Sequence, residues 1–188
     1  MKFSIFIFIS FFVISCKEKK LSEISVDDFQ QFVSDTGYKT DAEIYNWSIV
    51  QEDVFNYVVL GGVNWKCPNG QQKAIGNDPV TQVSYNDALA YCKWSQTRLP
   101  TYKEYWTLAE KSILPINQNS TEIFPVGMSN IIGNVWELTE ADLLGRVRLA
   151  GGSYLCSPNS CDGTSPDRVL YVDQITGNSH IGFAVLER

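Results

Sequence analysis

The chain has 188 residues and is net acidic, with 15 Lys and Arg residues against 21 Asp and Glu residues. No basic cluster occurs beyond the "KEKK" of residues 17–20. Electrostatic binding of nucleic acid needs such a cluster, so we expect no DNA or RNA partner. The length suffices for one hydrophobic core of ordinary size and is too short for two large domains.

Residues 1–15 have the pattern of an export signal, in which one Lys precedes an apolar run too short to span a bilayer comfortably. A retained transmembrane helix is the weaker interpretation. The "VISC" that ends at Cys16 resembles the bacterial lipobox, in which the cysteine is acylated after cleavage. This resemblance implies a lipoprotein, anchored to a membrane of the bacterial cell envelope on its periplasmic side or at the cell surface. The alternative is an ordinary export signal with a coincidental cysteine. Residues 16–24 would form a polar tether.

Three capping patterns predict three short helices, because a Ser or Thr followed three residues later by an acidic residue can satisfy the free amides of a helix start. The pairs are Ser25 with Asp28, Ser84 with Asp87, and Thr101 with Glu104. Gly37 is expected to end the first helix. Residues 44–70 alternate aromatic and β-branched residues between Gly and Pro breaks, which predicts strands or extended loops that pack Trp47 and Trp65. Residues 180–188 are expected to form a terminal strand.

Four cysteines remain beside Cys16, and an exported chain meets an oxidising compartment where disulfides are allowed. Cys156 and Cys161 lie five positions apart in "GGSYLCSPNSC", so they can form a disulfide or bind a soft metal ion. Cys92 is most simply a buried thiol. A bridge between Cys67 and Cys92 is also open.

Six segments stand in the order in which they occur in the formylglycine-generating enzyme family, also called the sulfatase-modifying factor domain, and the chain resembles this family from about residue 26 to residue 185. The segments are residues 27–43, 61–70, 78–110, 124–140, 151–161 and 180–185. The resemblance implies an α+β, C-type-lectin-like fold over residues 25–188. Little regular secondary structure is expected, with three short helices and a small antiparallel sheet.

Enzymes of that family hold Cu(I) between two thiolates and use dioxygen to convert a cysteine of a sulfatase to formylglycine. Cys156 and Cys161 occupy the positions of this pair, so the resemblance implies that they bind copper and that the substrate is a protein or peptide containing cysteine. Thiolate ligands suit Cu(I), which is a soft ion. Ser153, Trp136 and His180 fall on positions of the same catalytic pocket. Core packing of Trp136 and a structural role of His180 are the alternatives.

The segment "NIIGNVWE" matches a calcium site of the family at Asn130, Gly133, Val135 and Glu137. The resemblance implies side-chain oxygens from the first and last of these residues and backbone carbonyl oxygens from the other two. Calcium prefers such oxygen ligands and tolerates irregular loops. The alternative is a turn in which Glu137 caps a backbone amide.

Two departures from the family pattern bear on function. Residues 162–172, "DGTSPDRVLYV", replace an Arg- and Tyr-rich stretch that binds substrate in the enzymes, and the segment before residue 124 lacks the family's other calcium site. We therefore hold two hypotheses. The first is a lipid-anchored, copper-dependent oxidoreductase of the formylglycine-generating type, and the second is a non-catalytic, calcium-stabilised binding or scaffold module of the cell envelope.

Overall fold

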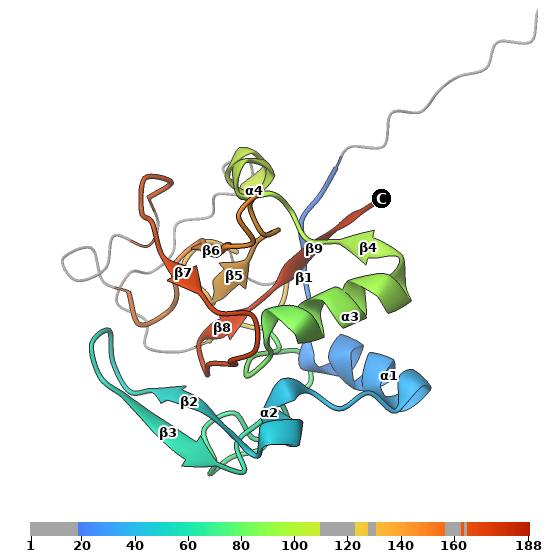
Figure 1. The fold of residues 1–188 in the computed structure, drawn as a ribbon, viewed down its shortest axis with the longest axis vertical. Helices are drawn as coiled ribbons and strands as arrows, with labels where there is room; N and C mark the ends of the chain where they lie inside the picture. Colours follow the sequence, from blue (N-terminus) through green and yellow to red (C-terminus); the bar gives the residue numbers. More distant parts are fainter. Residues whose placement is uncertain (1–18, 110–122, 128–130, 157–162, 164) are drawn as a thin grey trace, which may run out of the picture.

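A computed structural model describes residues 19–109, 123–127, 131–156, 163 and 165–188 (Figure 1). The described helices are α1 (Val26–Thr36), α2 (Asp41–Tyr45), α3 (Tyr85–Ser95) and α4 (Tyr102–Ala109). The strands are β1 (Ser22–Glu23), β2 (Trp47–Gln51), β3 (Tyr57–Gly61), β4 (Thr97–Arg98), β5 (Trp136–Leu138), β6 (Val147–Ala150), β7 (Tyr171–Val172), β8 (Ile181–Gly182) and β9 (Ala184–Glu187).

The strands form three small sheets with the orders β1-β9-β4, β2-β3 and β7-β6-β5-β8. All pairs are antiparallel except β5 with β8. The predicted α+β class is correct. The structure has three small sheets and one parallel strand pair in place of the one small antiparallel sheet that was expected. The parallel pair was not predicted, because its two strands are only two or three residues long, too short for an alternating pattern, and lie far apart in sequence.

All three predicted capping boxes are present. The Ser25 hydroxyl accepts from the Asp28 amide at 3.1 Å, and the Asp28 carboxylate accepts from the Ser25 amide at 3.1 Å. The same reciprocal contacts join Ser84 and Asp87. Gly37 ends α1 in the left-handed conformation, with φ of 67°, as its position predicted.

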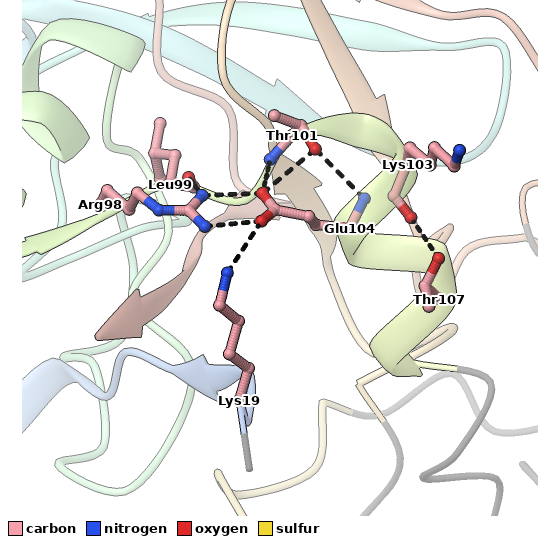
Figure 2. A network of polar contacts seen from close by, with 7 residues as sticks. All are labelled: Lys19, Arg98, Leu99, Thr101, Lys103, Glu104 and Thr107. Atoms are coloured by element: carbon pink, nitrogen blue, oxygen red, sulfur yellow. Dashed lines mark hydrogen bonds and ion pairs between the residues drawn. The ribbon is translucent and has the colours of Figure 1, made fainter. Parts of the chain in front are cut away.

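Figure 2 shows that the third capping box also anchors the start of α4 to its surroundings. The Glu104 carboxylate accepts from the Thr101 amide at 3.0 Å and from both terminal nitrogens of Arg98 at 2.6 and 2.7 Å. The Lys19 ammonium lies 3.5 Å from the same carboxylate. One acidic side chain therefore caps α4 and joins it to β4 and to the chain that precedes β1.

The structure adds the short helix α2, which the helical patterns in the sequence did not predict. Thr40 and Glu43 form a fourth capping box at its start, with the Thr40 amide donating to Glu43 at 3.0 Å. The capping signal was present in the sequence, but five residues with one buried side chain carry no helical periodicity.

Aromatic side chains fill the main core between α1, α3 and β9. Phe29 is fully buried and meets the rings of Phe32 and Trp65 edge-on, each with 5.3 Å between centroids. The predicted burial of Trp65 is correct. The predicted packing of Trp47 is wrong, because Trp47, the first residue of β2, is 40% exposed. Tyr57, the first residue of β3, is exposed as well.

Strand β9 holds the two ends of the described chain together. Ser22 and Glu23 pair with Val185 and Ala184, so strand pairing already begins within the segment predicted as a tether. Residues 180–188 form β8 and β9 rather than one uninterrupted strand. Within the described ranges, we find no helix with the length and apolar character needed to cross a bilayer.

Candidate active site

Three of the five predicted active-site residues come together from separate strands. Ser153 follows β6, Trp136 opens β5, and His180 lies directly before β8. The Ser153 hydroxyl oxygen lies 3.3 Å from Nδ1 of His180. The Trp136 amide donates to the His180 carbonyl at 2.9 Å, which continues the parallel pairing of β5 with β8. This pairing therefore sets the position of His180 against β5.

The three residues differ in exposure, and His180 is the one that solvent reaches in part. Ser153 and Trp136 are almost fully buried. Burial lowers the pKa of His180 from 6.5 to about 4, so the imidazole is neutral at physiological pH. When His180 carries its proton on Nε2, Nδ1 accepts a hydrogen bond from the Ser153 hydroxyl. The pair is thus an uncharged polar contact.

Two glycines allow the loops to pass close to the Trp136 ring. Gly152 has φ of 71°, and a Cβ there would lie 2.9 Å from the carbonyl carbon of Gly163. A Cβ on Gly163 would lie 2.8 Å from Cη2 of Trp136. Side chains at either position would push the loops apart, so these glycines are required for the close approach of the two loops.

Cys156 is disulfide-bonded, and its partner lies outside the described residues, as does Cys161. The Cys156 amide donates to the Ser153 carbonyl at 2.8 Å, which fixes the cysteine backbone one turn away from Ser153. The side chain is half-buried and packs against the main core cluster, which includes Trp136. Cys67 and Cys92 are both free thiols, and Cys92 is buried as predicted, so the open Cys67–Cys92 bridge is not formed.

The predicted calcium ligand Glu137 lies in β5 and is fully buried. Neither of its carboxyl oxygens has a hydrogen bond of good geometry to any described residue. The Glu23 carboxyl and the Ala184 amide nevertheless lie close enough to affect its pKa. Burial, and then the negative charge of Glu23, raise the pKa of Glu137 well above its ordinary value. Burial raises the pKa of Glu23 to about 7.

Two further residues border this pair of carboxyl groups. The Asn134 side-chain amide donates to Glu23 at 3.2 Å. The Tyr105 hydroxyl is buried without a partner among the described residues, and burial followed by the charges of Glu137 and Glu23 raises its pKa. Neither Glu23 nor Tyr105 was among the site residues predicted from the sequence. For Glu23, the signal available in the sequence was an acidic residue in the short segment before α1.

The other predicted calcium positions are placed only in part. Asn130 lies outside the described residues. Gly133 has φ of 88°, and its amide donates to the Gly151 carbonyl at 2.7 Å, while Val135 is fully buried. Among the described residues, no three His, Cys, Asp or Glu side chains gather as a metal-binding group.

The chain is similar in sequence to a known family and to several of its members. Residues 19–113 match the family described as "Sulfatase-modifying factor enzyme 1-like domain". The chain is similar to the formylglycine-generating enzyme of Mus musculus, with 30% identity over 213 aligned positions that cover 74% of this chain and 57% of that protein. The corresponding values for the formylglycine-generating enzyme of Thermomonospora curvata are 35% identity, 62% and 44%. An inactive C-alpha-formylglycine-generating enzyme 2 of Bos taurus is 28% identical, with 75% and 65% covered.

Solved structures show the same fold. The structure of PvdO from Pseudomonas aeruginosa matches with a TM-score of 0.60 and 12% identity, covering 88% of this chain and 77% of that one. The crystal structure of CarF matches with a TM-score of 0.53 and 18% identity, covering 88% and 84%. These identities support the fold alone.

The match to the family covers half of the chain, and it ends before the segments that carry Trp136, Ser153, Cys156 and His180. The chain spans 57% of the length of the mouse relative. With the family match and the shared fold taken together, the chain belongs to the sulfatase-modifying factor family.

Proposed function

We propose that this chain is an oxidase of the formylglycine-generating type that acts on a cysteine of a protein substrate, such as a sulfatase. The observation that carries the proposal is the set of contacts that brings Ser153, His180 and Trp136 together within one turn of Cys156. The relatives from mouse and Thermomonospora curvata that are named formylglycine-generating enzymes support the reaction type.

Copper suits the donor set of this pocket, because Cys156 supplies sulfur and the sequence places Cys161 five residues later. The thiolates of these two cysteines would hold Cu(I). When bound, the ion would supply the activation of dioxygen, for which no side chain in the pocket has the chemistry. Cys156 is disulfide-bonded, so two electrons and two protons from a thiol reductant must first convert this disulfide to two thiols.

The remaining residues hold and shield the reacting cysteine of the substrate. The neutral imidazole of His180 fixes the Ser153 hydroxyl, which is then available as a polar contact that needs no charge. The Trp136 ring packs against Gly163 and limits the access of water. Replacement of these residues should therefore affect turnover more than folding.

The non-catalytic module is the second candidate, and the disulfide at Cys156 favours it. A cysteine held in a stable disulfide binds no copper and only closes a loop. The bovine relative named inactive shows that the family includes proteins without the activity. The loss of the Arg-rich stretch after residue 161 points in the same direction.

A calcium ion at Glu137 fits both candidates. Two fully buried carboxyl oxygens without hydrogen bonds of good geometry to described residues are suitable ligands for a hard cation, which would replace the proton that burial favours on Glu137. Glu137 would bind the ion together with Asn130 and the carbonyl groups of Gly133 and Val135. The ion would stabilise the fold by balancing the buried charge beside β5.

The test of the proposed function is aldehyde formation on cysteine peptides. The full chain is treated with mild thiol reductant, loaded with Cu(I) and incubated in air with a library of cysteine-containing peptides. The expected product has lost sulfur and is captured by a hydrazine. Cys156→Ser should abolish the product. Cys92→Ser should retain it, because Cys92 is a buried residue of α3 and is not among the predicted copper ligands. A copper-loaded protein that modifies no peptide supports the module instead.

A further inference from the structure

The β2–β3 hairpin has one covered edge and one edge that no described strand covers, which we call the free edge. The outer edge of β2 is covered by residues 177–179, since the Ile49 amide donates to the Gly177 carbonyl at 3.4 Å and its carbonyl accepts from the Ser179 amide at 3.0 Å. No described strand pairs with the outer edge of β3. In Figure 1, this hairpin projects from the body at the side opposite the start of β1.

The register shows which groups of β3 point outward. The Gly62 amide donates to the Asn46 carbonyl at 3.1 Å, and the Glu52 amide donates to the Asn56 carbonyl at 2.9 Å, at the two ends of the hairpin. Bonded and non-bonded pairs alternate along an antiparallel ladder. Every second residue of β3 therefore directs its N–H and C=O groups away from β2. These residues are Tyr57, Val59 and Gly61.

The free edge carries none of the features that normally prevent strand addition. Proteins protect such edges with Lys, Pro or bulges, but the sequence of β3 is "YVVLG". Tyr57 is 61% exposed and Val59 is 58% exposed, and Phe55 at the tip is also exposed. Main-chain groups and apolar side chains are thus presented to solvent along the same edge.

The charge around the hairpin selects the kind of partner. Residues 40–65 include four acidic residues and no Lys or Arg. Glu43 is paired with Lys66, whereas Glu52 and Asp53 are exposed at the hairpin tip. An extended segment that carries Arg or Lys beside its apolar residues would complement this edge.

The hairpin is also bonded directly to the candidate active site. The Gln51 amide donates to the Ser179 hydroxyl at 2.9 Å, and Ser179 precedes His180 in the chain. A peptide held along the hairpin is therefore bound to the same rigid unit that positions His180 and Ser153.

We propose that the outer edge of β3 binds an extended, Arg- or Lys-flanked segment of the cysteine-containing protein substrate as a third strand. This proposal rests on the proposed function. Main-chain hydrogen bonds to Val59 and its neighbours would supply affinity, the exposed side chains of Tyr57 and Val59 would supply packing, and Glu52 would attract the flanking cation.

The test uses full-length protein and a fluorescent peptide of nine residues, Arg-Val-Thr-Val-Cys-Thr-Val-Thr-Arg, with binding measured by fluorescence anisotropy. A matched peptide carries N-methyl groups on alternate amides, which block strand addition. Val59→Pro removes an outward N–H and leaves the ladder to β2 intact, whereas Val59→Ala keeps the N–H. We expect about tenfold weaker binding for Val59→Pro and less than about threefold for Val59→Ala. Glu52→Lys should weaken binding and reduce its salt dependence.

Equal binding of the parent and N-methylated peptides by the wild-type protein would overturn the proposal, and this comparison does not depend on whether Val59→Pro folds. It would also be overturned if the chain sediments as a dimer that Val59→Pro dissociates while the peptide stays unbound, because the edge then binds a second copy. A higher KM with unchanged kcat in Val59→Pro would support it. Peptide binding without aldehyde formation would count against the proposed function and still support the edge.

Discussion

The Ser153 hydroxyl oxygen lies 3.3 Å from Nδ1 of His180, although 27 positions separate the two residues in the chain. His180 is the only histidine of the chain, and burial keeps it uncharged at physiological pH. The contact therefore joins the loop that carries Cys156 to the start of β8 without adding a buried charge.

Loss of this contact should reduce turnover. We expect Ser153→Ala to lower kcat by roughly a hundredfold to a thousandfold in the aldehyde assay, because a positioned hydrogen-bond donor typically contributes that much. His180→Asn should retain more activity than His180→Ala, since an amide can still bond to Ser153. Ser34→Ala on the exposed side of α1 serves as the control. Because burial lowers the pKa of His180 to about 4, the rate should show no step from His180 between pH 5.5 and 8. Wild-type kcat and KM in Ser153→Ala would remove Ser153 from the site.

The state of the Cys156 disulfide should control copper binding. After mild reduction, anaerobic titration with Cu(I) should show uptake of about one equivalent, since one soft ion needs two thiolates. Cys156→Ser and Cys161→Ser should each lose this uptake, and Cys92→Ser should keep it. If the disulfide resists mild reductant, and the double variant only lowers the melting temperature, the loop is a structural staple.

Removal of calcium should lower the melting temperature of the wild-type protein. We expect Glu137→Gln to abolish this effect of a chelator, and Asn130→Ala to weaken it. In the presence of chelator, Glu137→Gln should melt above wild type, because the raised pKa means that wild-type Glu137 must take up a proton on folding at neutral pH, whereas Gln is already neutral. Glu140→Gln, at an exposed position three residues later, is the matched control. A wild-type melting curve that the chelator leaves unchanged would exclude the site.

The buried carboxyl group of Asp87 should make stability depend on pH. Burial raises the pKa of Asp87 from 3.8 to about 6, despite hydrogen bonds from the Ser84 amide and the Tyr38 hydroxyl. The folded state therefore binds more protons than the unfolded state between these values, so the free energy of unfolding should fall as pH rises from about 4 to about 6. The full change is about 3 kcal/mol. Denaturant titrations at several pH values should show that the free energy of unfolding of Asp87→Asn depends less on pH than that of wild type. The exposed control Asp35→Asn should show the wild-type pH dependence.

Lipidation at Cys16 can be tested by metabolic labelling with a palmitate analogue. The label should mark the protein, and Cys16→Ser should lose the label and release the domain into the soluble fraction, because acyl chains supply the anchoring free energy. Cys92→Ser should remain labelled and membrane-bound. Equal labelling of Cys16→Ser would exclude the lipoprotein hypothesis.

Local features were predictable from the sequence because their causes are local. The capping boxes at Ser25, Ser84 and Thr101 depend on side chains three residues apart, and the end of α1 depends on a single glycine. The pocket residues Ser153 and His180 came from the family resemblance, since no periodicity connects two loops.

Long-range features were not predictable in the same way. Glu23 lies in a two-residue strand, too short for an alternating pattern, and its burial follows from pairing with β9 across the whole fold. The exposure of Trp47 could not be read from its apolar character, because only the assembled sheets show that the β2–β3 hairpin has an uncovered edge. Residue type predicts a tendency to be buried, whereas the arrangement of neighbours decides it.

The position of β9 between β1 and β4 has a consequence for biosynthesis. Thr97 and Ser22 both depend on partners in residues 184–187, so neither contact can form while the ribosome still holds the last strand. Helices α1 and α3 can form earlier, but the Phe183 ring that completes their shared core arrives with the same late segment. The β1-β9-β4 sheet and the aromatic core therefore close only after residues 183–187 have left the ribosome, so the earlier helices wait for this segment in an incompletely packed state.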